Sequence, residues 1–173
     1  MLVTVIGGSG SGKSEFAECI AQKYHNRRLF YIATMKPYGE EALLRIKRHR
    51  KMREKKGFET IECYNNLKKL NIENSVVLLE CMSNLVANEI FDMQNKNTSE
   101  EILQAVFALA QKNVLIVVTN DVFSDGNTYS KETVDYIRAV SKINIQLVNM
   151  SDTVTEVVCG IPIYIKGGEA DAV

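Results

Sequence analysis

Near the start of the sequence, Gly7-Gly-Ser-Gly-Ser-Gly-Lys-Ser14 matches the pattern G-x-x-x-x-G-K-[ST]. An apolar run over residues 2–6 precedes it and predicts a buried strand, while apolar residues at helical spacing predict a helix over 13–24. Glycines let the backbone curl so that successive N–H groups point at one anion, and the helix N-terminus adds partial positive charge. The stretch therefore predicts a P-loop that binds the phosphates of a nucleotide.

Two side chains of this loop have separate predicted roles. Lys13 can reach the β- and γ-phosphates as a point charge, which makes it a catalytic candidate as well as a nucleotide ligand. The hydroxyl of Ser14 can bind both the nucleotide and Mg²⁺. The other expected nucleotide-binding residues of the loop are Gly7, Gly8, Ser9, Gly10, Ser11 and Gly12. The alternative, a turn that only connects strand to helix, is disfavoured by the flanking strand and helix.

The rest of the chain alternates apolar runs with segments of helical period. Strands are predicted over 29–34, 58–63, 75–80, 114–119, 153–159 and 161–166, and helices over 40–56, 83–92, 99–111 and 131–150. This alternation predicts one α/β domain over residues 1–173, with a mostly parallel sheet and helices on both faces. The last two strands are too close for a helical crossover, so one of them is expected to run antiparallel.

The composition limits the function classes. Of 173 residues, 21 are Lys or Arg and 21 are Asp or Glu, and zero net charge argues against a general nucleic-acid binder. No apolar run is long enough to span a membrane and no signal-peptide pattern is present, so a cytoplasmic location is expected. The four cysteines lack C-x-x-C pairing and zinc-ligand spacing, which predicts reduced thiols, mostly in the core.

A P-loop enzyme also needs a carboxylate at the end of a neighbouring strand to orient Mg²⁺. Glu80 ends the apolar run 75–80, and Asn120 and Asp121 follow the apolar run 114–119. Because ligands bind at the carboxyl ends of parallel strands, all three side chains could face the site. Glu80 is the first choice for metal binding and catalysis, and Asn120 is a nucleotide-binding candidate. The alternative for Glu80 is a cap on the helix that follows it.

A basic helix is the second feature that could take part in catalysis. Residues 45–56 read RIKRHRKMREKK, and residues four apart lie on one helical face, so Arg45, His49 and Arg53 form a stripe. One interpretation is a solvated face, and another is a nucleic-acid surface, which the zero net charge and the lack of aromatics disfavour. The third is a catalytic helix, with His49 as base or nucleophile and Arg45 and Arg53 holding phosphates.

Six short motifs follow one another along the chain, and the phosphate loop is the first of them. Beyond the phosphate loop they are Tyr31-Ile-Ala-Thr34, Arg45-Ile-Lys-Arg-His49, Leu78-Leu-Glu-Cys81 with Asn88, Val118-Thr-Asn-Asp121, and Val157-Val-Cys-Gly-Ile161 with Ile165-Lys166. Over nearly its whole length the chain resembles the bifunctional adenosylcobinamide kinase/adenosylcobinamide-phosphate guanylyltransferases of cobalamin biosynthesis. One departure lies in the phosphate loop, where Gly10 stands in place of the family's usual arginine.

The resemblance implies a RecA-like P-loop fold and a two-step chemistry with Mg²⁺. In the kinase step, ATP or GTP would give its γ-phosphate to the aminopropanol hydroxyl of adenosylcobinamide. In the second step, His49 would attack the α-phosphate of GTP, release pyrophosphate and pass GMP to adenosylcobinamide phosphate. The resemblance also implies a homo-oligomer, because the family's characterised members are propeller-shaped trimers. Thr34 and Glu62 complete the predicted nucleotide-binding set.

Two other functions remain open from the residues alone. The first is a small P-loop kinase for another metabolite, in which His49 is structural. The second is a nucleotide-binding regulatory module or RNA-associated NTPase that docks through the basic helix. The chain lacks the N-K-x-D guanine reader, so the choice of GTP over ATP depends on the resemblance alone.

Overall fold

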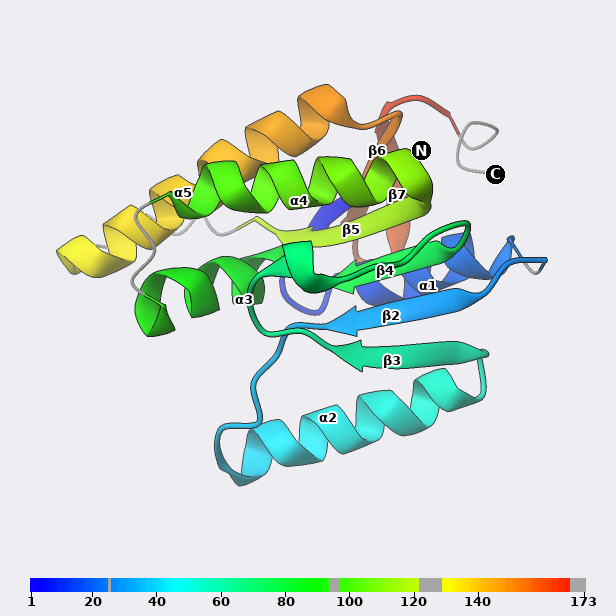
Figure 1. The fold of residues 1–173 in the computed structure, drawn as a ribbon, viewed down its shortest axis with the longest axis horizontal. Helices are drawn as coiled ribbons and strands as arrows, with labels where there is room; N and C mark the ends of the chain where they lie inside the picture. Colours follow the sequence, from blue (N-terminus) through cyan, green and yellow to red (C-terminus); the bar gives the residue numbers. More distant parts are fainter. Residues whose placement is uncertain (25, 94–96, 122–128, 169–173) are drawn as a thin grey trace.

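A computed structural model describes residues 1–24, 26–93, 97–121 and 129–168 (Figure 1). Within helix α2 it leaves out the side chains of residues 41, 42, 45, 48, 49, 52 and 54. The described residues form a seven-stranded sheet of order β3-β2-β4-β5-β1-β6-β7. Its strands are β1 (Leu2–Gly7), β2 (Leu29–Ala33), β3 (Phe58–Glu62), β4 (Val76–Glu80), β5 (Val114–Asn120), β6 (Thr153–Val158) and β7 (Ile161–Lys166).

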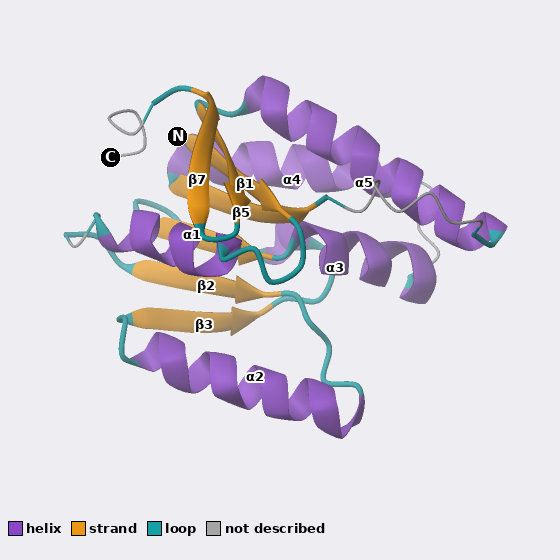
Figure 2. Ribbon diagram, turned by 180° about the vertical axis from the view of Figure 1, so that it is seen from behind, coloured by secondary structure: helices purple, strands orange, loops and turns teal. Residues whose placement is uncertain are grey.

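Helices cover both faces of this sheet (Figures 1 and 2). The helix α1 packs on one face, α3, α4 and α5 pack on the other, and α2 runs along the outer edge beside β3. Short turns of 3₁₀ and π type form η1 and η2, and η2 directly continues α3. The bounds are α1 (Lys13–Gln22), α2 (Gly39–Glu54), η1 (Leu67–Lys69), α3 (Met82–Ala87), η2 (Asn88–Asp92), α4 (Thr98–Lys112) and α5 (Lys131–Met150).

Strand β4 shows why helices are needed on both faces. Its side chains alternate, so that Val77 and Leu79 join the core cluster with α3, α4 and α5, whereas Val76 and Leu78 join the cluster with α1. All four are fully buried. A strand that is apolar on both faces gains the free energy of burial only if each face is covered.

The predicted architecture is confirmed in its main features. The strands pair in parallel except for β7, which runs antiparallel to β6 as the short connection required. The helix expected over 83–92 begins at Met82 and changes to π-helical geometry at Asn88. The expectation of mostly buried thiols is wrong in part: all four cysteines are free, but Cys19 and Cys159 are exposed. In the described part of the chain, no helix is long and apolar enough to cross a membrane.

The sheet register brings the predicted site residues to one edge. Glu80 is in register with Ala33 of β2 and Val118 of β5. Gly7, at the end of β1, is in register with Asn120 of β5. Four adjacent strands therefore end together, at the edge where α/β sheets bind their ligands.

Candidate functional site

The phosphate loop lies between β1 and α1 and contacts the C-terminal hairpin. Gly12 precedes α1 with a φ of +92°, in the left-handed region that favours glycine. The N–H of Gly160, in the turn between β6 and β7, donates to the carbonyl oxygen of Ser11 at 2.8 Å. A Cβ on Gly7 would lie 2.6 Å from the carbonyl oxygen of Val157. The hairpin and the glycines together fix the curvature of the loop.

Replacement of Gly12 with alanine is expected to lower the free energy of unfolding by about 1–2 kcal/mol, because alanine is strained in the left-handed region. Its Cβ would also meet the Gly160 Cα at 3.2 Å. Chemical denaturation without nucleotide would measure the loss. Gly8→Ala is the matched control, since a Cβ there meets nothing within 4 Å and the φ of Gly8 lies outside the left-handed region. Equal stability losses in the two variants would contradict this account.

The first turn of α1 carries the two functional side chains of the loop. Lys13 is buried, and its Nζ donates to the carbonyl oxygen of Gly8 at 2.9 Å, which holds the ammonium over the loop. The Ser14 hydroxyl donates to Glu80 Oε1 at 2.6 Å. The two predicted metal-binding side chains are therefore in direct contact. The capping alternative for Glu80 finds no support, because its other oxygen, Oε2, accepts from the Tyr31 hydroxyl at 2.6 Å.

Tyr31 and Arg53 extend this contact to helix α2. The guanidinium carbon of Arg53 lies 3.5 Å from the centre of the Tyr31 ring, a cation–π geometry, and both residues are buried. Burial raises the pKa of Tyr31 well above its usual range, and the adjacent charge of Glu80 raises it further. The phenol therefore stays protonated and remains a hydrogen-bond donor to Glu80 at physiological pH.

A cavity of about 330 Å³ opens beside these residues, a volume near the lower end of ligand pockets. It brings together eight of the residues predicted from the sequence: Ser9, Gly10, Lys13, Ser14, Arg53, Glu62, Glu80 and Asn120. A second hollow is lined by loop residues, by the first turn of α1 and by Glu18 and Lys56. Lys56 forms an ion pair with Glu18 there, which ties the end of α2 to α1.

Two predicted nucleotide-binding residues make contacts within the protein. Thr34 is fully buried, and its hydroxyl donates to the carbonyl oxygen of Cys81 at 2.9 Å and accepts from the N–H of Cys81 at 2.8 Å. Thr34 therefore joins the ends of β2 and β4. The Asn120 side chain lines the cavity and donates to the Ser83 hydroxyl at 2.7 Å. Nucleotide contact by Thr34 and Asn120 stays a prediction.

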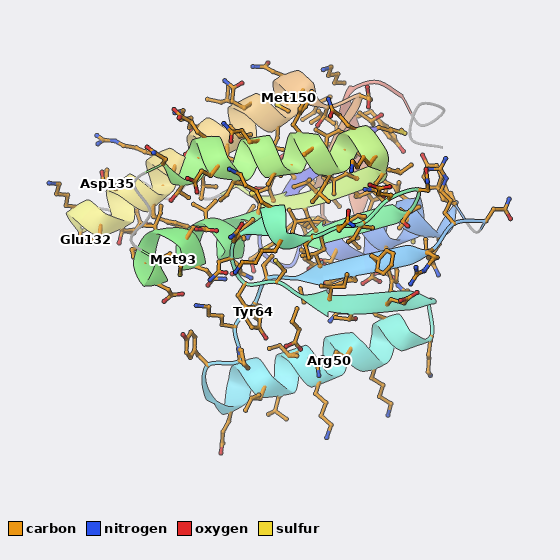
Figure 3. The ribbon with its side chains drawn as sticks, in the orientation of Figure 1. Arg50, Tyr64, Met93, Glu132, Asp135 and Met150 are labelled. Carbon is orange, nitrogen blue, oxygen red and sulfur yellow. The ribbon has the colours of Figure 1, made fainter. Side chains whose placement is uncertain are left out.

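Helix α2 contributes part of the cavity wall. The side chains of Arg45 and His49 lie outside the described residues, although both positions belong to the helix. Figure 3 shows Arg50 on α2. Arg50 lines the cavity and forms an ion pair with Glu62 of β3. Glu62 also accepts from the Tyr64 hydroxyl at 2.7 Å. The helix that carries the candidate nucleophile is therefore attached to β3 and β2 by arginine contacts.

Cys81 contributes a thiol to the lining of the cavity. Burial raises the pKa of its thiol, and its Sγ lies 3.1 Å from the Ser83 hydroxyl. A thiol with a raised pKa is a poor nucleophile at neutral pH. Cys81 is therefore a lining residue rather than a competitor of His49 for covalent chemistry.

The oxygen atoms of Ser14 and Glu80 fit Mg²⁺, which prefers hard oxygen ligands. Among the described residues, no group of three or more His, Cys, Asp or Glu side chains could hold a metal. Mg²⁺ is commonly bound by one carboxylate together with waters and substrate phosphates, and not by an all-protein cage. The Glu80 carboxylate and the Ser14 hydroxyl suit that arrangement.

Sequence reasoning did not assign a site role to Tyr31 or Arg50. Tyr31 was visible only as part of a strand motif, and nothing in the sequence indicated that its hydroxyl meets Glu80. Arg50 precedes Arg53 by three residues, a spacing that also places side chains on one helical face. A search for neighbours three apart as well as four apart would have found it. The other cavity-lining residues not anticipated are Ala33, Met35, Ile46, Cys81 and Asn84.

Comparison of the sequence with known proteins finds a matching family. The family model described as cobinamide kinase/cobinamide phosphate guanyltransferase matches residues 3–165. The bifunctional adenosylcobalamin biosynthesis protein CobU of Escherichia coli (strain K12) is 30% identical over 184 residues, covering 96% of this chain and 100% of the relative. The protein of the same name from Salmonella typhimurium (strain LT2) is 28% identical over 185 residues, with the same coverage.

A solved structure shows the same fold at much lower sequence identity. The Pyrococcus horikoshii OT3 protein PH0250 is 11% identical to this chain with a TM-score of 0.55, and the match covers 99% of this chain and 89% of that one. A solved ATPase domain gives a similar result, with 13% identity, a TM-score of 0.53 and coverage of 90% and 68%. These likenesses support the P-loop fold and carry no information on substrate.

Proposed function

Because the chain belongs to the cobinamide kinase/cobinamide phosphate guanyltransferase family, we propose that it works through a guanylyl-histidine formed on His49. Family membership makes the protein a kinase and guanylyltransferase of cobalamin biosynthesis. Family membership excludes the two alternatives, which were a kinase for another metabolite and a regulatory or RNA-associated module. The observation that carries the proposal is the cavity shared by the phosphate loop, Glu80 and the arginines of α2.

In the kinase step, the aminopropanol hydroxyl of adenosylcobinamide attacks the γ-phosphorus of ATP or GTP, and the bond to the β-phosphate oxygen breaks. Backbone N–H groups of the loop and the Lys13 ammonium bind the β- and γ-phosphates. Ser14 and Glu80 would hold Mg²⁺, which would neutralise charge on these phosphates. Catalysis of this kind depends on positioning and charge stabilisation rather than on protein covalent chemistry.

In the guanylyl step, a neutral imidazole nitrogen of His49 attacks the α-phosphorus of GTP, and pyrophosphate leaves. A phosphate oxygen of adenosylcobinamide phosphate then attacks the same phosphorus, and the phosphorus–nitrogen bond breaks to release adenosylcobinamide-GDP. The intermediate splits one displacement into two steps. Support comes from the position of His49 on α2, one turn before the cavity-lining Arg53. The positive charge of Arg50 and Arg53 offsets charge that develops on the phosphates.

Two labelled substrates test the proposal directly. GTP labelled at the γ-phosphate is expected to label adenosylcobinamide, and GTP labelled at the α-phosphate is expected to label first the protein and then adenosylcobinamide phosphate. Failure of the γ-label to reach adenosylcobinamide from either GTP or ATP would overturn the kinase assignment. Direct labelling of the corrinoid product with no protein-bound label under single-turnover conditions would overturn the histidine intermediate.

Replacement of Glu80 with glutamine is expected to lower kcat of the kinase step by about 100-fold, because the amide loses the charge that suits Mg²⁺. The Mg²⁺ concentration for half-maximal rate should rise. Glu59→Gln is the matched control, since Glu59 lies on β3 in an exposed ion pair with Arg28. An unchanged rate and Mg²⁺ dependence in Glu80→Gln would rule out the assigned role of this carboxylate.

Several finer expectations stay predictions. A homo-oligomer, with the trimer as its expected form, is supported by the apolar outer face of the edge strand β7, where Ile161, Ile163 and Ile165 are 65%, 48% and 57% exposed. The preference for GTP in the guanylyl step and the cytoplasmic location are likewise proposed from the family and the sequence.

A further inference from the structure

Tyr31 connects two parts of the site that lie on different elements. Its hydroxyl contacts Glu80 at the end of β4, and its ring contacts Arg53 near the end of α2. The ring also packs edge-on against Phe58 of β3, with centroids 6.1 Å apart. Tyr31 is 3% exposed and still lines the cavity. One side chain in the middle of β2 therefore touches both the predicted metal carboxylate and the helix of the predicted nucleophile.

The hydroxyl has a defined effect on the carboxylate. The final torsion of a glutamate side chain is broad, so one hydrogen bond leaves its carboxylate free to turn. In Glu80, Ser14 donates to Oε1 and Tyr31 donates to Oε2, each at 2.6 Å. Donors on both oxygens fix the plane of the carboxylate relative to the phosphate loop. Such outer hydrogen bonds orient metal-binding carboxylates in many sites.

The ring has a separate effect on α2. This helix lies along the edge of the sheet beside β3, and its residue Arg53 is deeply buried. The Arg53 guanidinium stacks on the Tyr31 ring, which fixes the last turn of the helix against β2. His49 precedes Arg53 by four residues, so the same contact sets the backbone position from which His49 projects.

We propose that Tyr31 is a positioning residue for both half-reactions, orienting Glu80 through its hydroxyl and helix α2 through its ring. The inference rests on the proposed function, because Glu80 and His49 have their roles from it. A purely structural tyrosine would need only some hydrogen-bond partner for its buried hydroxyl. The partner here is the Glu80 carboxylate, which also accepts a hydrogen bond from Ser14 of the P-loop. The contact that satisfies the buried hydroxyl therefore also orients the predicted metal ligand.

The hydroxyl role is tested with Tyr31→Phe, which keeps the ring and its contact with Arg53. Binding of a non-hydrolysable GTP analogue would be measured by calorimetry over a series of Mg²⁺ concentrations. We expect the variant to need about 10-fold more Mg²⁺ for half-maximal enhancement of binding, the usual effect of removing an outer hydrogen bond at a metal site. Tyr24→Phe is the matched control, since the Tyr24 hydroxyl contacts the sulfur of Met1 away from the cavity.

The outcomes separate this inference from the proposed function. If the wild-type protein binds the analogue equally well with and without Mg²⁺, both the metal role of Ser14 and Glu80 and the hydroxyl role of Tyr31 are overturned. If the wild-type protein depends on Mg²⁺ and Tyr31→Phe has the same dependence, only the hydroxyl role is overturned. A shifted dependence in Tyr31→Phe but not in Tyr24→Phe supports it.

The ring role is tested with Tyr31→Leu, read against Tyr31→Phe. The rate of protein labelling by α-labelled GTP is measured at saturating nucleotide and Mg²⁺, where weaker metal binding no longer limits it. Tyr31→Leu is expected to label at least about 10-fold more slowly, since a misplacement of about 1 Å can reduce rates by 100-fold. Tyr31→Phe should retain most of the wild-type rate. Equal rates in the two variants would overturn the ring role.

Discussion

A His49→Ala variant is expected to form no guanylyl adduct, and its guanylyltransferase rate should fall by about 10⁴-fold or more, as for loss of other catalytic nucleophiles. The methyl group of alanine offers no lone pair to the α-phosphorus. Intact-mass spectrometry after incubation with GTP and Mg²⁺ would show the wild-type protein gaining one guanylyl group and the variant gaining none. The adduct should be acid-labile and base-stable, as a phosphoramidate is.

The matched control is Lys47→Ala, which removes an exposed cation from the same helix. This variant should label at nearly the wild-type rate, because a solvated lysine contributes little to a specific contact. The kinase activity of His49→Ala should also persist, since γ-phosphate transfer does not use the imidazole. An adduct that forms equally well in His49→Ala would place the nucleophile elsewhere and remove the basis of the proposed second step.

A Lys13→Ala variant is expected to lose at least about 100-fold in the kinase rate, the usual effect of removing one preorganised charge donor in a phosphate site. The ammonium is held over the loop by the carbonyl oxygen of Gly8, so it needs little reorganisation to meet a triphosphate. Initial rates of γ-phosphate transfer and titration with a non-hydrolysable analogue would measure the loss in turnover and in affinity.

Lys23→Ala is the control for this change, because Lys23 lies just past the end of α1 and is exposed. It should leave both measurements close to wild type. The guanylyl step should weaken with Lys13→Ala as well if one loop holds the triphosphate for both reactions. Loss of kinase activity with a fully retained rate of protein labelling would indicate two separate nucleotide sites.

Local patterns were sufficient to predict the phosphate loop and the sheet. Residues 2–6 and 114–119 are apolar on both faces, so they form strands in almost any α/β context. Glu80 could also be chosen from the sequence, because an acid that directly follows a buried strand lies at the ligand-binding edge. Glu80 accepts a hydrogen bond from Ser14, and the metal role of the two residues stays a prediction. These predictions depend on residues that are adjacent in the sequence and on the rule that ligands bind at the carboxyl ends of parallel strands.

Contacts between segments that are distant along the chain could not be predicted from the sequence. Helical spacing put Arg53 on one stripe with Arg45 and His49 but left open whether that stripe faces solvent. The stacking of the Arg53 guanidinium on Tyr31 depends on how α2 lies against β2. The sequence also did not predict that the Thr34 hydroxyl bonds the backbone of Cys81, and nucleotide contact by Thr34 stays a prediction. A single sequence does not say which of several polar groups at a strand end faces the cavity and which satisfies a neighbouring backbone group.

The contact between Ser11 and Gly160 has a consequence for the order of folding. The phosphate loop lies close to one end of the chain, and the turn that packs on it lies close to the other. On the ribosome, the first strand and its loop emerge long before the hairpin that closes around them. A nascent chain therefore cannot hold the finished loop geometry until β6 and its turn have been made, and the contact is among the most non-local in the molecule. Binding of a nucleotide thus reports on a chain in which the turn at Gly160 already packs on the phosphate loop.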